Sequence, residues 1–157
     1  MIKILFVCHG NICRSPMAEF VLKDMVKKKG VEKLFYIASA ATSTEEIGNT
    51  VHPGTQTVLE KLSISTKGKR AIQMTKKDYE EYDYIVAMDS WNIKNIYRII
   101  GEDSLSKVQR LLDYTHNPRD IADPWYTRDF DRTYQEVYEG CEFLLNMICA
   151  QNNITLH

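Results

Sequence analysis

The sequence has little of what marks secreted, membrane-spanning or nucleic-acid-binding proteins. Only 4 of its 157 residues are cysteine, too few for the disulfide framework of a small secreted domain. The formal net charge is -1 at pH 7, so no basic excess favours nucleic acid. No apolar run approaches the length of a membrane span, and the N-terminal run is too short for a signal peptide. We therefore expect a cytoplasmic chain with no membrane span and no nucleic-acid partner.

Proline, glycine and low-complexity sequence are also scarce. The chain has 4 prolines and 7 glycines, and it shows no repeat and no linker. Hydrophobic residues make up 44% and charged residues 26%, as in ordinary globular proteins. A chain of this length can bury a sizeable core. The sequence therefore predicts a single domain over residues 1–157 and, by default, a monomer.

Apolar runs alternate with helical patterns along the chain. A strand buried on both faces of a parallel sheet is apolar almost throughout. Such strands are expected at residues 2–7, 34–39, 82–89 and 107–112. Helices are expected at 15–29, after Pro53, after Thr75, at 90–100 and near the C-terminus. The alternation predicts an α/β fold, with a four-stranded parallel sheet covered by helices on both faces.

The stretch of most interest reads CHGNICRS and follows the first expected strand. Ligands bind outside the carboxyl ends of the strands in such sheets. Ser15 is expected to cap the next helix, with Pro16 in its first turn, and a helix start offers unpaired N–H groups to an anion. Glycine permits a close approach, asparagine tolerates left-handed backbone, and arginine suits two phosphate oxygens. We expect this loop to bind phosphate through His9, Gly10, Asn11, Ile12, Cys13, Arg14 and Ser15.

Cys8 would lie at the floor of this anion cradle. Positive surroundings favour a thiolate, and a thiolate there can attack phosphorus to form a phosphocysteine. The leaving oxygen then needs a proton donor, for which Asp123 in the stretch ADPWY is the candidate. Asp123 lies on a loop after the fourth expected strand, and so at the same sheet edge. Trp125 and Tyr126 could wall the cleft and exclude water.

Plainer interpretations of these residues stay open. Cys8 could be a buried structural thiol, and Asp123 could be a turn residue before proline. Trp125 and Tyr126 could simply cover the edge of the core. A zinc site is a further alternative, but the cysteine spacing is not the usual one. Its ligands would be Cys8, His9 and Cys13.

Other residues with reactive side chains show no such pattern. Cys141 and Cys149 lie on the last expected helix, where packing is expected. Ser39 and Asp89 end expected strands, so each could cap a helix or hold a loop. The remaining histidines are expected at the surface; these are His52, His116 and His157.

The stretch VCHGNICRSPMAE with the later DPWY resembles the low-molecular-weight protein tyrosine phosphatases. The likeness continues in SAATS (39–43) and AIQMTKKDYEEYDYIVAMD (71–89), and it covers nearly the whole chain. The resemblance implies a flavodoxin-like three-layer fold. It implies hydrolysis of phosphotyrosine in proteins, or of small aryl phosphates, with neither cofactor nor metal.

The resemblance also implies a role for each matching residue. Cys8 would be the nucleophile, Arg14 the phosphate clamp and Asp123 the general acid and base. Three further residues would order the loop and assist the thiolate; these are Asn11, Ser15 and Ser39. Cys13 matches a second loop cysteine that can form a reversible disulfide with Cys8, although a packing role is an equal alternative.

The sequence departs from the family pattern at the mouth of the expected cleft. His9 replaces an apolar residue, and Trp125 replaces a tyrosine. Glu45 and Glu46 stand where several relatives have an aromatic residue, and Lys69 stands where some have histidine. We expect a substrate rim that consists of His9, Glu45, Glu46, Trp125 and Tyr126. The two glutamates should disfavour acidic sequence next to the phosphotyrosine.

Three rival functions fit parts of the pattern. Arsenate reductases resemble this family but need further cysteines near the loop, whereas Cys141 and Cys149 lie on the last expected helix. Sugar phosphotransferase B components carry phosphate on a cysteine after the first strand, but they would not need Arg14 and an acid such as Asp123. A phosphoprotein-binding module without catalytic activity would not need a nucleophile, a phosphate-binding arginine and a general acid together.

Overall fold

Four strands form one parallel sheet at the centre of the protein. The computed structural model describes all residues, 1–157. Its strands are β1 (Ile2–Cys8), β2 (Phe35–Ala41), β3 (Tyr84–Ala87) and β4 (Val108–Arg110). They lie in the order β2-β1-β3-β4, and every neighbouring pair is parallel. The predicted sheet is confirmed, and its strand order is that of flavodoxin-like folds.

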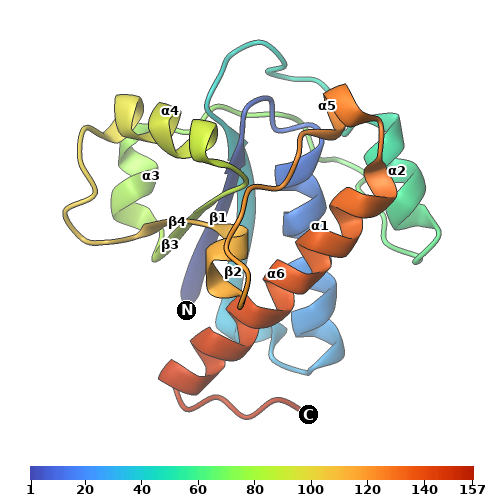
Figure 1. Cartoon of the computed structure of the whole chain (residues 1–157). Coiled ribbons are helices and arrows are strands. Elements are labelled where there is room, and N and C mark those ends of the chain that lie inside the picture. The colour runs from blue at the N-terminus through green and yellow to red at the C-terminus, as the bar shows by residue number, and fades with distance from the viewer.

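Helices cover both faces of this sheet. They are α1 (Arg14–Lys28), α2 (Pro53–Glu60), α3 (Lys76–Glu81), α4 (Ser90–Ile100), α5 (Pro124–Thr127) and α6 (Phe130–Gln151). Two short 3-10 helices lie at Glu32–Leu34 and Leu111–Tyr114. In Figure 1, α1 and α6 lie on one side of the sheet with α2 beside them, and α3 and α4 lie on the other. No helix is long and apolar enough to cross a membrane.

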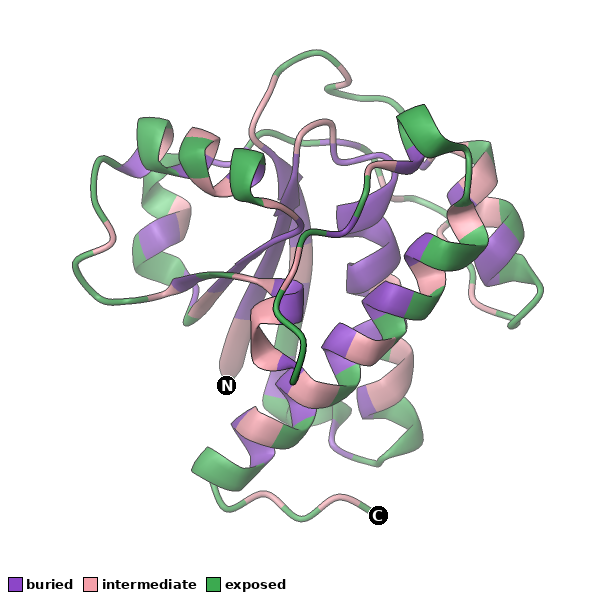
Figure 2. Ribbon diagram, viewed as in Figure 1, coloured by how far each residue is buried: buried purple, intermediate pink, exposed green.

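The side chains of β1 alternate between two cores. Ile4, Phe6 and Cys8 belong to the larger core, under α1 and α6. Leu5 and Val7 belong to the smaller core, under α3 and α4. The strands are buried along most of their length, and α6 is buried along one stripe (Figure 2). The period of two in β1 therefore fixes the side on which Cys8 emerges.

The start of α1 differs from the prediction. The helix begins at Arg14 with Cys13 in the N-cap position, and no side chain caps it. Pro16 lies in the first turn, as predicted. The prediction that Ser15 caps the helix is wrong, because its hydroxyl bonds Cys8 and Asn11 instead.

Local signals predicted some boundaries better than others. The helix at 90–100 is confirmed, with Asp89 as its cap and Gly101 beyond its end at a φ of 88°. Pro53 begins α2, and Thr75 caps α3, both as predicted. The strand predicted at 107–112 is too long, because only residues 108–110 pair with β3.

Candidate active site

A cavity of about 350 Å³ opens at the carboxyl end of β1. Three separate segments line it: the loop after β1, the loop after β2 and the start of α5. Its lining residues are Cys8, His9, Gly10, Ile12, Cys13, Arg14, Glu45, Glu46, Asp123, Trp125 and Tyr126. The structure thus brings together the predicted nucleophile, clamp, acid and rim residues. Asn11, Ser15 and Ser39 are buried behind the cavity.

Asn11 holds the loop after β1 in its curled form. Its φ is 58°, in the left-handed region that asparagine tolerates. Its Nδ2 donates to Ser15 Oγ at 2.8 Å and to Ser39 Oγ at 2.9 Å, and its Oδ1 accepts from Ile72 N at 3.2 Å. A Cβ on Gly10 would lie 3.3 Å from Glu46 Cγ, a tight contact that would need a small shift of the Glu46 side chain.

The sulfur of Cys8 lies in a buried, hydrogen-bonded position. Cys8 is the last residue of β1, and its Sγ lies 3.0 Å from Ser15 Oγ. Because Ser15 Oγ already accepts from Asn11, its own proton is free to point at the sulfur. A hydroxyl donor at this distance stabilises a thiolate more than a thiol. The contact therefore places a hydroxyl donor beside the sulfur of the predicted nucleophile.

Arg14 is buried and surrounded by acceptors. Its Nη1 donates to Asp89 Oδ2 at 2.6 Å and to Ile121 O at 2.7 Å, and its Nη2 lies 3.5 Å from Asp123 Oδ2. Burial by itself would lower the pKa of Arg14, but Cys8 and Asp89 outweigh it and hold the pKa above its ordinary value. The guanidinium stays charged at the floor of the cavity. Asp89 caps α4 with one carboxylate oxygen and binds Arg14 with the other. It is therefore both a helix cap and a site residue.

Asp123 lies between the cavity and α5. Its Oδ1 accepts from Trp125 N at 3.0 Å and caps α5, while its Oδ2 faces Arg14. The residue is thus a turn residue and a cavity residue at once. The sequence pattern predicted only a loop here and missed α5. The missed helix is short, and Pro124 at its first position was its only strong signal.

Cys13 packs beside the loop as a buried thiol. It lies against Ile12 and Ala71, and its carbonyl accepts from Thr55 Oγ1 at 3.2 Å. Burial raises the pKa of Cys13 to about 12, and the charges of Cys8 and Asp123 add to this effect. The neutral thiol suits the packing interpretation. Both loop cysteines are free here, and their pairing under oxidation stays a prediction.

Glu19 is a buried residue that the sequence analysis missed. Its Oε1 accepts from Ser39 Oγ at 2.6 Å, and its Oε2 accepts from Lys23 Nζ at 2.6 Å. Lys69 Nζ lies 3.7 Å from Oε1 and donates to Ser39 O at 2.8 Å. Burial lowers the pKa of Lys69, although Glu19 opposes this effect. Glu19 follows Ser15 by four residues on α1, so the two side chains lie on the same helix face. This spacing was the sequence signal that could have linked Glu19 to the site.

The rim carries both charged and aromatic side chains. His9 Nε2 lies 2.9 Å from Glu45 Oε2. The Trp125 ring and the His52 ring meet edge to face, with 5.8 Å between ring centroids. His52 also stacks on Phe130 at 5.0 Å and caps α2. His52 was expected at the surface, and it is instead half-buried between Trp125 and Phe130, although it does not line the cavity.

The structure also bears on the zinc alternative and on the two remaining cysteines. No group of three or more His, Cys, Asp or Glu side chains is arranged to hold a metal ion. Cys141 and Cys149 are buried in the larger core, as predicted for packing residues. Cys141 lies 3.8 Å from the carbonyl oxygen of Ala18.

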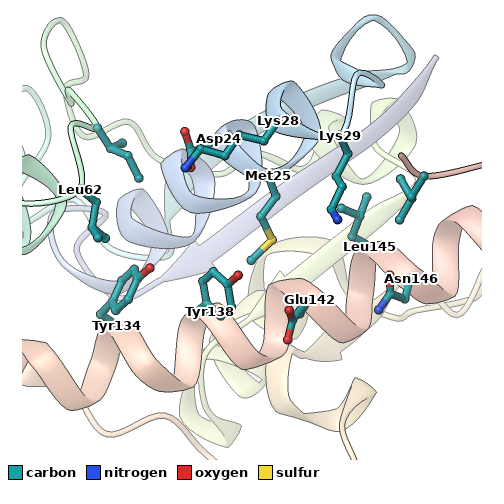
Figure 3. Close-up of a pocket in the computed structure, with 12 residues that line it drawn as sticks. Asp24, Met25, Lys28, Lys29, Leu62, Tyr134, Tyr138, Glu142, Leu145 and Asn146 are labelled. Carbon is teal, nitrogen blue, oxygen red and sulfur yellow. The ribbon is translucent and has the colours of Figure 1, made fainter.

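A second cavity of about 370 Å³ lies between α1 and α6 (Figure 3). Met25, Tyr138 and Leu145 form much of its apolar wall, and Lys28 pairs with Asp24 at 2.9 Å on its rim. None of the predicted site residues lines it. The phosphate chemistry expected from the sequence belongs to the first cavity.

Known proteins of similar sequence and structure support one family. The family model described as low molecular weight phosphotyrosine protein phosphatase matches residues 3–153. The low molecular weight protein-tyrosine-phosphatase YfkJ of Bacillus subtilis is 43% identical over 156 residues, which is 98% of this chain and 100% of the relative. PtpA of Staphylococcus aureus, with the same description, is 34% identical over 155 residues and 98% of each chain.

Solved structures give the same result. The crystal structure of YfkJ from Bacillus subtilis matches with a TM-score of 0.92 over 96% of each chain. The low molecular weight protein tyrosine phosphatase SP-PTP from Streptococcus pyogenes matches at 42% identity with a TM-score of 0.84, over 94% of this chain and 93% of that one. The resemblance seen in the sequence is thereby confirmed. The chain belongs to the low molecular weight phosphotyrosine protein phosphatase family.

Proposed function

We propose that the chain is a metal-independent hydrolase of aryl phosphate monoesters, with phosphotyrosine in proteins as its substrate. It would act as a single domain over residues 1–157, as a monomer and in the cytoplasm. The observation that carries this proposal is that Cys8, Arg14 and Asp123 line one cavity. Cys8 and Arg14 lie at the two ends of one loop, Asp123 comes from a distant part of the chain, and each has a place in one reaction.

The first step transfers the phosphoryl group to sulfur. The Cys8 thiolate attacks phosphorus, the bond to the aryl oxygen breaks, and Asp123 gives its proton to the leaving oxygen. Arg14 and the N–H groups of the loop bind the equatorial oxygens as charge develops. The Arg14 side chain is already held in place by Asp89 at 2.6 Å, so little entropy is lost when phosphate binds.

The second step releases phosphate. Water attacks the phosphocysteine, Asp123 takes a proton from it, and the thiolate of Cys8 leaves. Ser15 stabilises this leaving thiolate through the 3.0 Å contact between Oγ and Sγ. Asn11 and Ser39 position Ser15 and the loop rather than the substrate.

The depth of the nucleophile favours an aryl substrate. Cys8 is only 3% exposed, and Ile12, Trp125 and Tyr126 line the way to it. The side chain of phosphotyrosine is long and flat enough to pass between such walls, whereas phosphoserine is shorter. Apolar and aromatic side chains on the walls also suit the faces of an aromatic ring.

Hydrolysis of para-nitrophenyl phosphate at mildly acidic pH tests the proposal. The wild type is expected to turn over this substrate in the presence of a chelator, while Cys8→Ser is expected to be inactive. Cys149→Ser is a matched control, since Cys149 is also a free thiol but lies away from the cavity. A folded and reduced wild type without turnover would refute the proposal.

Arsenate reduction is the rival with the most similar site. It would need a relay of further thiols near the loop, in addition to Cys8 and Cys13. Cys141 and Cys149 are buried in the larger core along α6, which supports hydrolysis instead. An assay for reduction of arsenate with a dithiol reductant would separate the two functions.

A further inference from the structure

Two carboxylates stand together on one wall of the active-site cavity. Glu45 and Glu46 both come from the loop after β2, and both line the cavity. Glu45 is exposed, and its Oε2 lies 2.9 Å from His9 Nε2. Glu46 is half-buried, and its Oε2 accepts from Asn49 Nδ2 at 2.5 Å. Each acidic side chain is therefore held at the mouth by a hydrogen bond. A protonated His9 offsets the charge of Glu45, whereas Glu46 forms no ion pair.

Few cations offset this negative charge at the mouth. Arg14 is at the floor, where Asp89 and Asp123 already face it. The guanidinium of Arg128 lies over the Trp125 ring, 6.0 Å from its centroid, and Arg128 does not line the cavity. Arg70 donates to Gly48 O at 2.9 Å and does not line the cavity. The wall that holds Glu45 and Glu46 is thus the acidic side of the entrance.

A protein substrate must lay its chain across this entrance. Because Cys8 is buried, only the phosphotyrosine side chain can enter, and its neighbours in sequence remain at the rim. Those neighbours then lie near the two glutamates in water, where charges interact over less than about 10 Å. The phosphate itself is an anion that the loop and Arg14 bind below, so it does not offset the negative charge of the wall.

We infer that Glu45 and Glu46 select phosphotyrosine that is flanked by basic residues. The inference rests on the proposed phosphatase function and narrows its substrate class. His9 restricts the movement of the Glu45 side chain through their 2.9 Å contact. An exposed ion pair changes an equilibrium constant by up to about fivefold. Replacing acidic neighbours of the phosphotyrosine by basic ones exchanges repulsion for attraction, so we expect a total change of about threefold to tenfold in kcat/KM.

Three phosphotyrosine peptides of equal length test the inference. Their residues on both sides of the phosphotyrosine are lysine, glutamine or glutamate. The wild type at low salt is expected to hydrolyse the lysine peptide with the highest kcat/KM and the glutamate peptide with the lowest. Added salt is expected to reduce this ratio, because the charges at the rim are in contact with water.

Variants that lack the two charges test whether Glu45 and Glu46 cause the preference for basic peptides. In the double variant Glu45→Gln and Glu46→Gln, the ratio between the lysine and glutamate peptides is expected to fall close to one. Glu80→Gln is the matched control, since Glu80 is exposed on α3 and does not line the cavity, and it is expected to keep the full ratio.

The outcomes separate the two proposals. Hydrolysis of para-nitrophenyl phosphate together with equal kcat/KM for the three peptides would overturn the inference alone. A salt-dependent ratio that survives in the double variant would also overturn it, because another group would then be responsible. Failure to hydrolyse para-nitrophenyl phosphate would overturn the proposed function, and the inference with it.

Discussion

Single residues at this site hold several contacts at once. Asn11 takes the left-handed conformation and also joins Ser15 on α1 to Ser39 on β2. Asp123 caps α5 with one carboxylate oxygen and faces Arg14 with the other. A change at either residue should therefore alter both the local backbone and the chemistry, and the experiments must separate the two effects.

The role proposed for Asp123 predicts a dependence on the leaving group. Asp123→Asn can neither give nor accept the proton, so kcat should fall by about 10²–10⁴-fold. The loss should be larger for phenyl phosphate than for para-nitrophenyl phosphate, because nitrophenolate leaves without help. Steady-state kinetics with the two substrates measure this difference. Asp120→Asn is the control, since Asp120 lies nearby but bonds Arg110 at 2.9 Å; an equal loss in both variants would argue against the acid role.

The raised pKa of Cys13 predicts that its thiol is slow to react. Burial raises this pKa to about 12, so Cys13 stays protonated near neutral pH and only a thiolate reacts quickly. Brief treatment with iodoacetamide should label Cys8 and leave Cys13 free, as read by mass spectrometry of peptides. The denatured protein, with all 4 cysteines accessible, gives the reference. Equal labelling of the two loop cysteines in the folded protein would contradict the prediction.

At the scale of elements, the site depends on contacts between helices as well as on the loop after β1. Phe130 at the start of α6 stacks on His52 at the start of α2, and His52 meets Trp125 of α5. Gly54 allows this arrangement, because a Cβ there would lie 2.5 Å from the Phe130 ring. The position of α5, and of Asp123 at its cap, thus follows from packing between α2 and α6.

Gly54→Ala should disturb this packing. The added methyl group forces the Phe130 ring away, at a cost of about 1–3 kcal/mol in the free energy of unfolding. The displacement should pass through His52 to Trp125 and lower kcat/KM. Urea denaturation and para-nitrophenyl phosphate kinetics measure the two effects. Thr57→Ala, at an exposed position of α2, is expected to change neither; full stability and activity in Gly54→Ala would show that α5 is placed in another way.

Elements with strong local signals were predicted well, and those without were not. The helix at 90–100 has a capping aspartate before it and a glycine after it. The strand predicted at 107–112 was too long, because Leu111 and Leu112 are buried in a 3-10 helix and an apolar run does not distinguish the two. The contacts of Glu19 and His52 join distant segments, and such contacts depend on packing that no local pattern records.

At the scale of the whole molecule, several cysteine thiols and tyrosine hydroxyls keep their protons to a higher pH in the folded protein than in the unfolded chain. Burial raises the pKa of Cys13 to about 12, and it also raises the pKa of Cys141, Tyr82 and Tyr114. Unfolding exposes these groups, which then lose protons above ordinary values of about 8.5 for thiols and about 10 for phenols. The native state therefore binds more protons than the unfolded chain at alkaline pH, and the free energy of unfolding falls as pH rises.

This linkage predicts alkaline destabilisation. The Tm should be several degrees lower near about pH 10.5 than near about pH 8. Thermal unfolding followed by circular dichroism measures it. Cys141→Ala removes one of the groups, so its Tm should fall less over the same range when compared with its own value near pH 8. A Tm that does not change between these pH values would contradict the prediction.

The most direct test of the proposed chemistry is to trap the phosphorylated enzyme. The protein is mixed with para-nitrophenyl phosphate, quenched in acid within milliseconds and digested for mass spectrometry. We predict a phosphoryl group on Cys8, present in the wild type and absent from Cys8→Ser. Turnover without any phosphorylated Cys8, or with the phosphoryl group on another residue, would contradict a phosphocysteine mechanism.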